Sequence, residues 1–219
     1  MAGKTKPARG MGPRGLGRHC AARLPAEIGL DHDEPADDSR PAARSARRVI
    51  LRLPHCTVRP WELGDAGALV RHANDREIWR NLRDRFPHPY TDADAERWLV
   101  WVTTSEPLTH FAIEVDGEAA GGIGFSLGED VHRRVAEIGY WLGRAIWGRG
   151  IATEALRALT DYAFAHHDLA RIQAFVYAWN PASMRVLEKA SYYREAKLRE
   201  AVTKDGATTD MLIYAVFRP

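Results

Sequence analysis

One stretch decides the predicted fold: Trp147-Gly148-Arg149-Gly150-Ile151-Ala152-Thr153-Glu154. The apolar segment Ala136–Leu142 precedes it, and a helical pattern from Ala152 to about His166 follows it. A strand is therefore expected to end in a glycine-rich turn, from which a helix begins. The first amides of a helix have no intrahelical partner and lie at the positive end of the helix dipole, which suits a phosphate. A plain helix cap explains the stretch equally well.

Two glycines and an arginine favour the phosphate interpretation. Gly148 and Gly150 allow positive φ and a close approach of a ligand to the backbone, and Arg149 can add a charged contact. No Lys-Ser/Thr pair follows the glycines, so the stretch is not a nucleotide-binding P-loop, and its spacing is not that of the dinucleotide motif GxGxxG. A different pyrophosphate-containing ligand is predicted.

Composition bounds the class of protein. The 219 residues fit one domain plus an appendage, and seven Trp indicate a substantial core. Two cysteines, Cys20 and Cys56, do not make a disulfide framework or a metal site. No apolar run reaches membrane-spanning length, and the first residues lack the apolar region of a signal peptide. We therefore expect a cytoplasmic protein with no membrane partner.

Residues 1–48 differ from the rest of the chain. They are rich in Gly, Pro, Ala and Arg without periodicity, which predicts a disordered leader or, given the abrupt change near Val49, a segment that is not translated. The acidic run Asp31–Asp38 is more typical of a solvated patch than of a metal site, so no metal is expected. The leader holds 10 of the 31 Lys and Arg and 6 of the 29 Asp and Glu, which leaves residues 49–219 a net charge of −2. A mildly acidic domain argues against nucleic acid as a partner.

Residues 49–219 are expected to form one domain. Its predicted helices are Ala66–Trp79, Thr91–Thr103, Ala152–His166 and Pro181–Ala190. Its predicted strands are Val49–Pro60, His110–Val115, Ala119–Leu127, Ala136–Leu142, Ala170–Trp179, Tyr192–Thr203 and Thr208–Phe217. The many glycines of the third strand indicate a bulge or a close neighbour. This order predicts an α/β fold with a central mixed sheet of about seven strands, flanked by about four helices.

Two segments carry a resemblance to a known family. The glycine stretch resembles the acetyl-CoA loop Q/R-x-x-G-x-G/A of the GNAT acetyltransferases, and its Trp-Gly-x-Gly form is similar to the RimJ/RimL-like branch, the ribosomal-protein N-terminal acetyltransferases. The segment Asn180–Lys189 resembles N-x-x-S-x-x-V-L-E-K of the same branch. The order of elements from residue 49 onward matches the GNAT-type acyl-CoA N-acyltransferase fold. The family continues with a glycine where this chain has Ser191, so Ser191 is expected to adopt the left-handed conformation at a cost of about 1 kcal/mol.

The resemblance implies acetyl-CoA as the co-substrate, held between two diverging strands, Ala136–Leu142 and Arg171–Trp179. Asn180 is implied to bind the pantetheine arm or to orient neighbouring groups. The acetyl end is implied to lie at the main chain of Ile138, Gly139 and Tyr140, and the pyrophosphate at the amides of Arg149, Gly150, Ile151, Ala152 and Thr153.

Acetyl transfer requires an acceptor amine to lose a proton and the leaving thiolate to gain one. Glu137, a carboxylate inside an apolar strand, is the candidate base, acting through a water; a pair with Arg133 or Arg134 is the alternative. Ser183 is the candidate acid, although a serine three residues after Asn180 also suits a helix cap. Some family members have, at the position of Leu187, a tyrosine that acts as the general acid. A tyrosine in that role is therefore excluded at this position.

The acceptor is expected to enter past the loop Arg83–Tyr90 and the last hairpin. Arg83, Arg85, His88 and Tyr90 are the candidate contacts, or the loop's two prolines only shape it. By analogy with the branch, the expected reaction is direct transfer of an acetyl group to a protein N-terminal α-amine. A small-molecule amine as acceptor, an acetyl-CoA sensor without transfer activity, and assembly as a homodimer all stay open, since fold does not settle substrate.

Overall fold

The computed structural model describes residues 49–219. The predictions for the leader, including its disorder, the acidic run Asp31–Asp38 and Cys20, lie outside the described residues. Within residues 49–219 no helix is long and apolar enough to cross a membrane.

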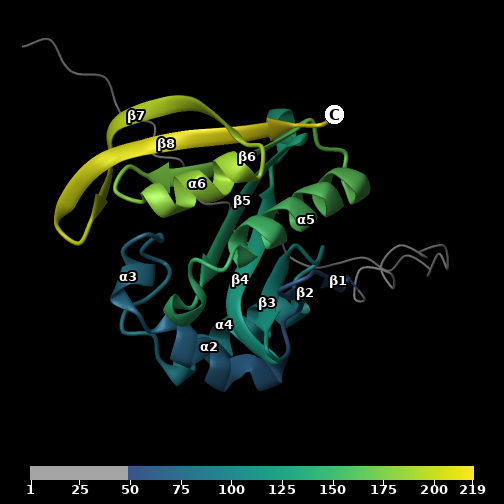
Figure 1. The fold of residues 1–219 in the computed structure, drawn as a ribbon, viewed down its shortest axis with the longest axis vertical. Helices are drawn as coiled ribbons and strands as arrows, with labels where there is room; N and C mark the ends of the chain where they lie inside the picture. Colours follow the sequence, from purple (N-terminus) through teal and green to yellow (C-terminus); the bar gives the residue numbers. More distant parts are fainter. Residues whose placement is uncertain (1–48) are drawn as a thin grey trace, which may run out of the picture. The chain divides into compact units, whose positions relative to one another are not determined.

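One mixed sheet of eight strands forms the centre of the described part (Figure 1). Its strands follow the order β1-β2-β3-β4-β5-β6-β8-β7, and all neighbours are antiparallel except β5 and β6. The strands are β1 (Leu51–Arg52), β2 (Thr57–Pro60), β3 (His110–Val115), β4 (Glu118–Leu127), β5 (Val135–Leu142), β6 (Arg171–Tyr177), β7 (Tyr193–Lys204) and β8 (Ala207–Phe217). The predicted α/β class with a central mixed sheet is confirmed, with eight strands instead of about seven.

Five α-helices and three short 3-10 helices accompany the sheet in residues 49–219. The α-helices are α2 (Ala66–Ala73), α3 (Arg76–Trp79), α4 (Asp92–Thr104), α5 (Ile151–His166) and α6 (Pro181–Lys189), and the 3-10 helices are η2 (Leu63–Asp65), η3 (Asp130–His132) and η4 (Arg144–Ile146). Local capping explains two of the starts. Thr91 and Asp94 form a capping box before α4, and Asn180 caps α6 with Pro181 at its first position.

Two predicted elements are each divided in the structure. The predicted strand Val49–Pro60 is folded back on itself at Pro54 and His55, so that β1 pairs with β2. The Leu53 N–H donates to the Cys56 carbonyl at 2.9 Å across this bend. The predicted helix Ala66–Trp79 ends at Ala73. Asp75 then caps α3 by accepting a hydrogen bond from the Glu77 N–H at 2.7 Å, which begins a new helix.

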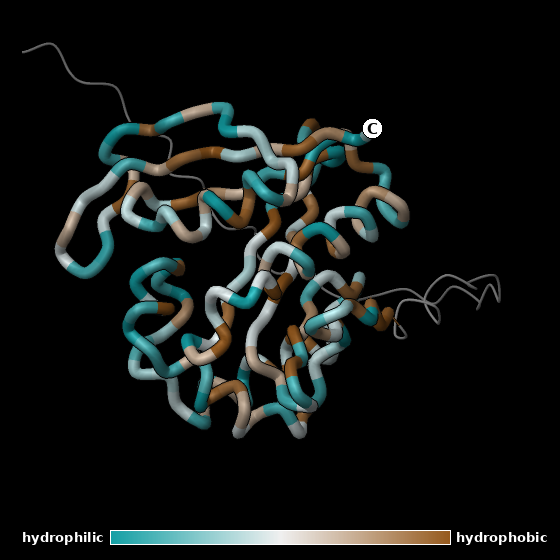
Figure 2. Tube along the Cα trace, in the orientation of Figure 1, coloured by the Kyte–Doolittle hydropathy of each residue, from teal (hydrophilic) through white to brown (hydrophobic). Residues whose placement is uncertain are grey.

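Helices cover both faces of the sheet around β3 and β4. One buried cluster joins α5 to the sheet through Leu156, Leu159, Ile123 and Phe125, and it extends to Leu187 of α6. A second cluster joins α2 and α4 to the opposite face of the sheet, with Leu69, Leu99 and Ala112 among its members. Figure 2 shows hydrophobic segments in the central strands and a hydrophilic turn at the free end of the β7–β8 hairpin. The strands β3 to β5 are therefore held rigidly next to the start of α5.

The glycines of β4 allow close contacts, as the sequence predicts. A Cβ on Gly121 would lie 2.5 Å from the Trp141 carbonyl oxygen on β5, and Gly122 and Gly124 lie against the rings of Trp141 and His110. The β3–β4 register also shifts between Ile113 and Glu114, next to Gly121. Both predicted features, the bulge and the close neighbour, are confirmed.

Ser191 adopts the predicted left-handed conformation after α6, with φ of 66°. Ser191→Gly is expected to raise the free energy of unfolding by about 1 kcal/mol, because glycine tolerates positive φ without steric cost. Urea unfolding measures the change. Ser105→Gly is the matched control at the end of α4, where φ is −72°. A gain of equal size at Ser105, or a loss at Ser191, would contradict the explanation.

Candidate active site

The strands β5 and β6 pair over only three residues and then diverge. The parallel pairs are Val135 with Arg171, Ala136 with Ile172, and Glu137 with Gln173. β5 nevertheless continues to Leu142, and it remains paired with β4 along the whole segment 136–142. Figure 1 shows β5 running down along β4 while β6 stays beside β8. The side of β5 that faces β6 is therefore without a strand partner beyond Glu137.

Main-chain alternation along β5 decides which groups face that side. The Gly143 N–H donates to the Ala120 carbonyl on β4, and the Val135 carbonyl accepts from Gly128, so the odd-numbered residues bond to β4. Gly139, opposite Gly124, therefore pairs with β4. The main-chain groups of Ile138 and Tyr140 point to the opposite side, toward β6. Of the three residues expected at the acetyl end, Ile138 lies where the strands separate, Tyr140 lies beyond, and the Gly139 amide is already paired.

Trp147 closes the far end of this strand edge. Its indole N–H donates to the Leu142 carbonyl at 2.8 Å, while 46% of the residue stays exposed. The carbonyl of Leu142 also points away from β4, by the same alternation. A ligand along the unpaired edge of β5 is thereby confined to the main chain before Leu142.

The glycine loop presents a row of free amides at the start of α5. Gly148 and Gly150 have φ of 79° and 83°, and a Cβ at either would meet no atom within 4 Å. Among residues 49–219, no hydrogen-bond partner exists for five consecutive N–H groups, from Gly148 to Ala152. The Thr153 N–H differs from the others, because it donates to the Gly150 carbonyl at 3.0 Å. Five free amides at the positive end of a helix dipole can hold an anion.

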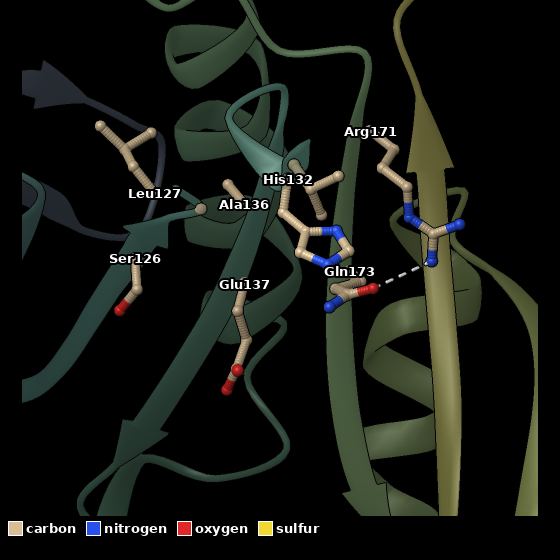
Figure 3. A pocket seen from close by; sticks show the side chains of 9 residues that line it. Ser126, Leu127, His132, Ala136, Glu137, Arg171 and Gln173 are labelled. Atoms are coloured by element: carbon tan, nitrogen blue, oxygen red, sulfur yellow. Dashed lines mark hydrogen bonds between the residues drawn. The ribbon is translucent and has the colours of Figure 1, made fainter. Parts of the chain in front are cut away.

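Glu137 lies on the face of β5 opposite α5, in a row of polar side chains. The strand register places it beside Ser126 of β4 and Gln173 of β6, and these side chains line one cavity (Figure 3). The volume of this cavity is about 560 Å³. The Glu137 carboxylate accepts a hydrogen bond from Arg83 at 2.5 Å, and 34% of the side chain is exposed. The partner is thus Arg83 of the loop after α3, and neither Arg133 nor Arg134. The carboxylate is less buried than a base inside an apolar strand was expected to be.

Ser183 and Asn180 lie in the first turn of α6. The Asn180 side chain accepts a hydrogen bond from the Ser183 N–H at 3.1 Å, which is the predicted cap. The Ser183 hydroxyl is 2.8 Å from the phenol of Tyr140 on β5. Burial raises the pKa of Tyr140 well above its ordinary value, although its bond with Ser183 opposes the shift. The hydroxyl of Ser183 therefore points to β5, close to where β5 and β6 separate.

The residues predicted to contact the acceptor differ in their exposure. Arg83 and His88 are exposed, and the His88 ring lies 5.6 Å from that of Trp79. Tyr90 is instead a core residue: it is 5% exposed, its ring lies 5.0 Å from Phe86, and burial raises the pKa of its phenol to about 12. The sequence predicts Tyr90 to be an acceptor contact at the end of a loop. In the structure it directly precedes the N-cap of α4 and packs against that helix. We therefore correct its expected role to a structural one.

The hairpin β7–β8 is bound to the acceptor loop at its free end. The Lys204 ammonium is 2.7 Å from the Asp84 carboxylate and 3.8 Å from the centre of the Trp79 ring, and only 2% of its side chain is exposed. Arg76 also pairs with Asp205 in the turn of the hairpin. Sequence reasoning missed these contacts. The only available signal was a lysine beside an Asp-Gly turn, which does not indicate its partner.

Within residues 49–219, no cluster of three or more His, Cys, Asp or Glu side chains is placed to hold a metal ion. The site thus combines a row of free amides, an unpaired strand edge, a carboxylate and a half-buried pair of hydroxyl groups. Such groups can hold a phosphorylated donor and move protons near it.

Comparison with known proteins agrees with this geometry. Residues 55–192 match the acetyltransferase (GNAT) domain family. An uncharacterised N-acetyltransferase of Bacillus licheniformis is 32% identical over 174 residues, which cover 77% of this chain and 96% of that protein. The ribosomal-protein-serine acetyltransferase of Escherichia coli is 32% identical over 48% of this chain and 58% of its own length. The solved structure of Mycobacterium smegmatis RimJ in complex with CoA-disulfide has a TM-score of 0.67 at 27% identity, covering 77% of this chain and 86% of that one.

Proposed function

Since the chain belongs to the GNAT acetyltransferase family and is an N-acetyltransferase of that type, we propose that it acetylates the N-terminal α-amine of a protein, in the cytoplasm, by direct transfer from acetyl-CoA. One observation carries the donor site: five consecutive free amides, Gly148 to Ala152, at the start of α5 beside the unpaired edge of β5. They fit a pyrophosphate, while the Tyr140 main chain is free to pair with an amide-containing arm such as pantetheine. The Thr153 amide is bonded within the turn and contributes less.

The face of β5 on which the acceptor is proposed to bind supports the α-amine of a polypeptide as the acceptor. This face of β5 is turned toward the loop after α3 and carries Glu137, Gly139 and Trp141. From that loop, Arg83 contacts Glu137 and Phe86 contacts Trp141. A Cβ on Gly139 would meet no atom within 4 Å, so this face leaves room for the narrow end of a polypeptide. One relative is named a putative ribosomal N-acetyltransferase and another a ribosomal-protein-serine acetyltransferase, which supports a protein acceptor. A small-molecule amine is the alternative acceptor.

The chain's residues have distinct roles in the proposed transfer. Glu137, released from Arg83, accepts the proton of the acceptor amine through a water. The main-chain groups around Tyr140 orient the donor, and Ser183 donates a proton to the departing sulfur. Asn180 holds the first turn of α6 and so places Ser183. Arg83 and His88 are the proposed acceptor contacts.

Two measurements on the full chain test the proposal. Calorimetric titration should show micromolar binding of acetyl-CoA and none of ATP or NAD. Release of CoA is then followed with peptides that carry a free α-amine, with the same peptides blocked at that amine, and with small amines. Release only with the free α-amine supports the proposed acceptor. Release with small amines alone contradicts it, and binding without any release would indicate a sensor.

Gly150→Ala is expected to weaken acetyl-CoA binding about tenfold, because an alanine at φ of 83° is strained by about 1–2 kcal/mol and shifts the amides of the loop. The same titration measures the change. Gly206→Ala is the matched control, since it has φ of 75° and open space but lies in the turn of the β7–β8 hairpin. If both variants bind acetyl-CoA as tightly as the unchanged protein, the glycine loop is not part of the binding site.

A further inference from the structure

Two hydroxyl groups from distant segments meet beside the β5–β6 divergence. The Tyr140 phenol lies 2.8 Å from the Ser183 hydroxyl and 3.3 Å from the Ser183 carbonyl oxygen. The two residues are 43 positions apart, one on β5 and one in the first turn of α6. Among residues 49–219, Tyr140 is the one hydrogen-bond partner of the Ser183 hydroxyl. A serine hydroxyl is free to rotate, so this contact determines where its proton points.

Tyr140 lies at two parts of the candidate site at once. Its main chain faces β6 beyond the last strand pair, where the donor is proposed to bind, and its side chain reaches α6 on the face of the sheet that α5 covers. Burial raises the pKa of its phenol, so the phenol stays protonated over the range in which an acetyltransferase operates. The phenol therefore keeps a proton that it can donate to the Ser183 hydroxyl oxygen.

We propose that Tyr140 is a positioning residue for proton delivery: its phenol donates to the Ser183 oxygen and leaves the Ser183 proton directed at the departing sulfur of CoA. This inference rests on the proposed function. The acceptor nitrogen is by then bonded to the acetyl carbon; as the C–S bond breaks, its electron pair goes to sulfur and Ser183 donates its proton there. Water returns a proton to the Ser183 oxygen and takes up in exchange the proton that Glu137 received from the amine. Tyr140 keeps its own proton. Accepting a hydrogen bond at oxygen also strengthens the donation from the same hydroxyl.

Tyr192, a buried tyrosine elsewhere in the core, provides a close control. The Tyr192 phenol lies 2.7 Å from the Thr160 hydroxyl of α5, and burial raises its pKa as well. It is 2% exposed and belongs to the core between α5 and α6. Tyr140→Phe and Tyr192→Phe therefore remove the same atom from the same type of bond, and only Tyr140 contacts a proposed site residue.

The test measures kcat at saturating acetyl-CoA and acceptor, the affinity for acetyl-CoA, and urea unfolding of the full chain. Tyr140→Phe is expected to lower kcat about ten- to thirtyfold with acetyl-CoA affinity within about twofold of the unchanged protein. Tyr192→Phe should leave kcat unchanged. In a double-mutant cycle, Tyr140→Phe with Ser183→Ala should lose no more activity than Ser183→Ala alone, because both act through one hydroxyl.

Three outcomes would overturn the inference. Tyr140→Phe could retain full kcat, Tyr192→Phe could lose as much, or the losses of Tyr140→Phe and Ser183→Ala could multiply in the double variant. Each requires an unchanged protein that releases CoA. If the unchanged protein releases none with any acceptor, the proposed function fails and this inference fails with it. The two failures are therefore distinguishable.

Discussion

Glu137→Gln is expected to lower kcat by a factor of about 10² to 10⁴, the usual contribution of a positioned general base. Glutamine keeps the shape of the side chain and an oxygen that can accept from Arg83, but it cannot take a proton at neutral pH. Acetyl-CoA affinity should stay the same, because Glu137 lies on the opposite face of β5 from Ser183 and α6. Steady-state kinetics with a free α-amine peptide, together with the acetyl-CoA titration, measure both quantities.

Glu114→Gln is the matched control for this variant. Glu114 is also a strand carboxylate bonded to an arginine at 2.5 Å, from Arg59, and 29% of its side chain is exposed, against 34% for Glu137. It lies on β3, away from the β5–β6 divergence. We expect Glu114→Gln to keep its kcat. If Glu137→Gln keeps more than half of the normal kcat, another group takes the amine proton and the proposed base is wrong.

Leu156→Ala is expected to lower the free energy of unfolding by about 2–5 kcal/mol. Leu156 is fully buried on α5 and packs with the core side chains of β4 and β5. Removing three carbon atoms there loses apolar burial and leaves a cavity, because the eight-stranded sheet beneath α5 is held by neighbours on both sides and relaxes only in part. This loss is a large share of the 5–15 kcal/mol typical of folded domains.

Urea unfolding of the two proteins measures that difference. Leu63→Ala is the control, since 65% of Leu63 is exposed in the short helix before α2, and its change should stay within about 0.5 kcal/mol. A comparable loss at both leucines would show that the effect is not due to packing under α5. A loss below about 1 kcal/mol at Leu156 would contradict the position of α5 against the sheet.

Local signals in the sequence predicted most elements within one or two residues. The predicted helix starts at Thr91 and Pro181 lie within one residue of the observed starts of α4 and α6, and the gap predicted between the strands that end at Val115 and begin at Ala119 separates β3 from β4. The two errors also have local causes. Pro54 divides the first strand, and the cap at Asp75 divides the second helix, in places where apolar spacing suggested continuity.

Three long-range contacts of the candidate site could not be predicted in this way. Arg83 pairs with Glu137 across 54 residues, Lys204 with Asp84 across 120, and Tyr140 with Ser183 across 43. The sequence offered nearer partners for Glu137, Arg133 and Arg134, and no indication that the Tyr140 side chain takes part at all. Tyr90 shows the opposite error, since an aromatic residue after a proline-containing loop belongs to the core.

The sequence by itself determined the glycine loop, the helix that follows it and the family to which the chain belongs. Capping, turn geometry and apolar periodicity act between residues at most a few positions apart, so they can be read along the chain. Tertiary structure decided which side chains meet and which amides stay free. Those depend on the order of strands in the sheet and on the separation of β5 from β6 after three pairs, and these follow from packing over the whole domain.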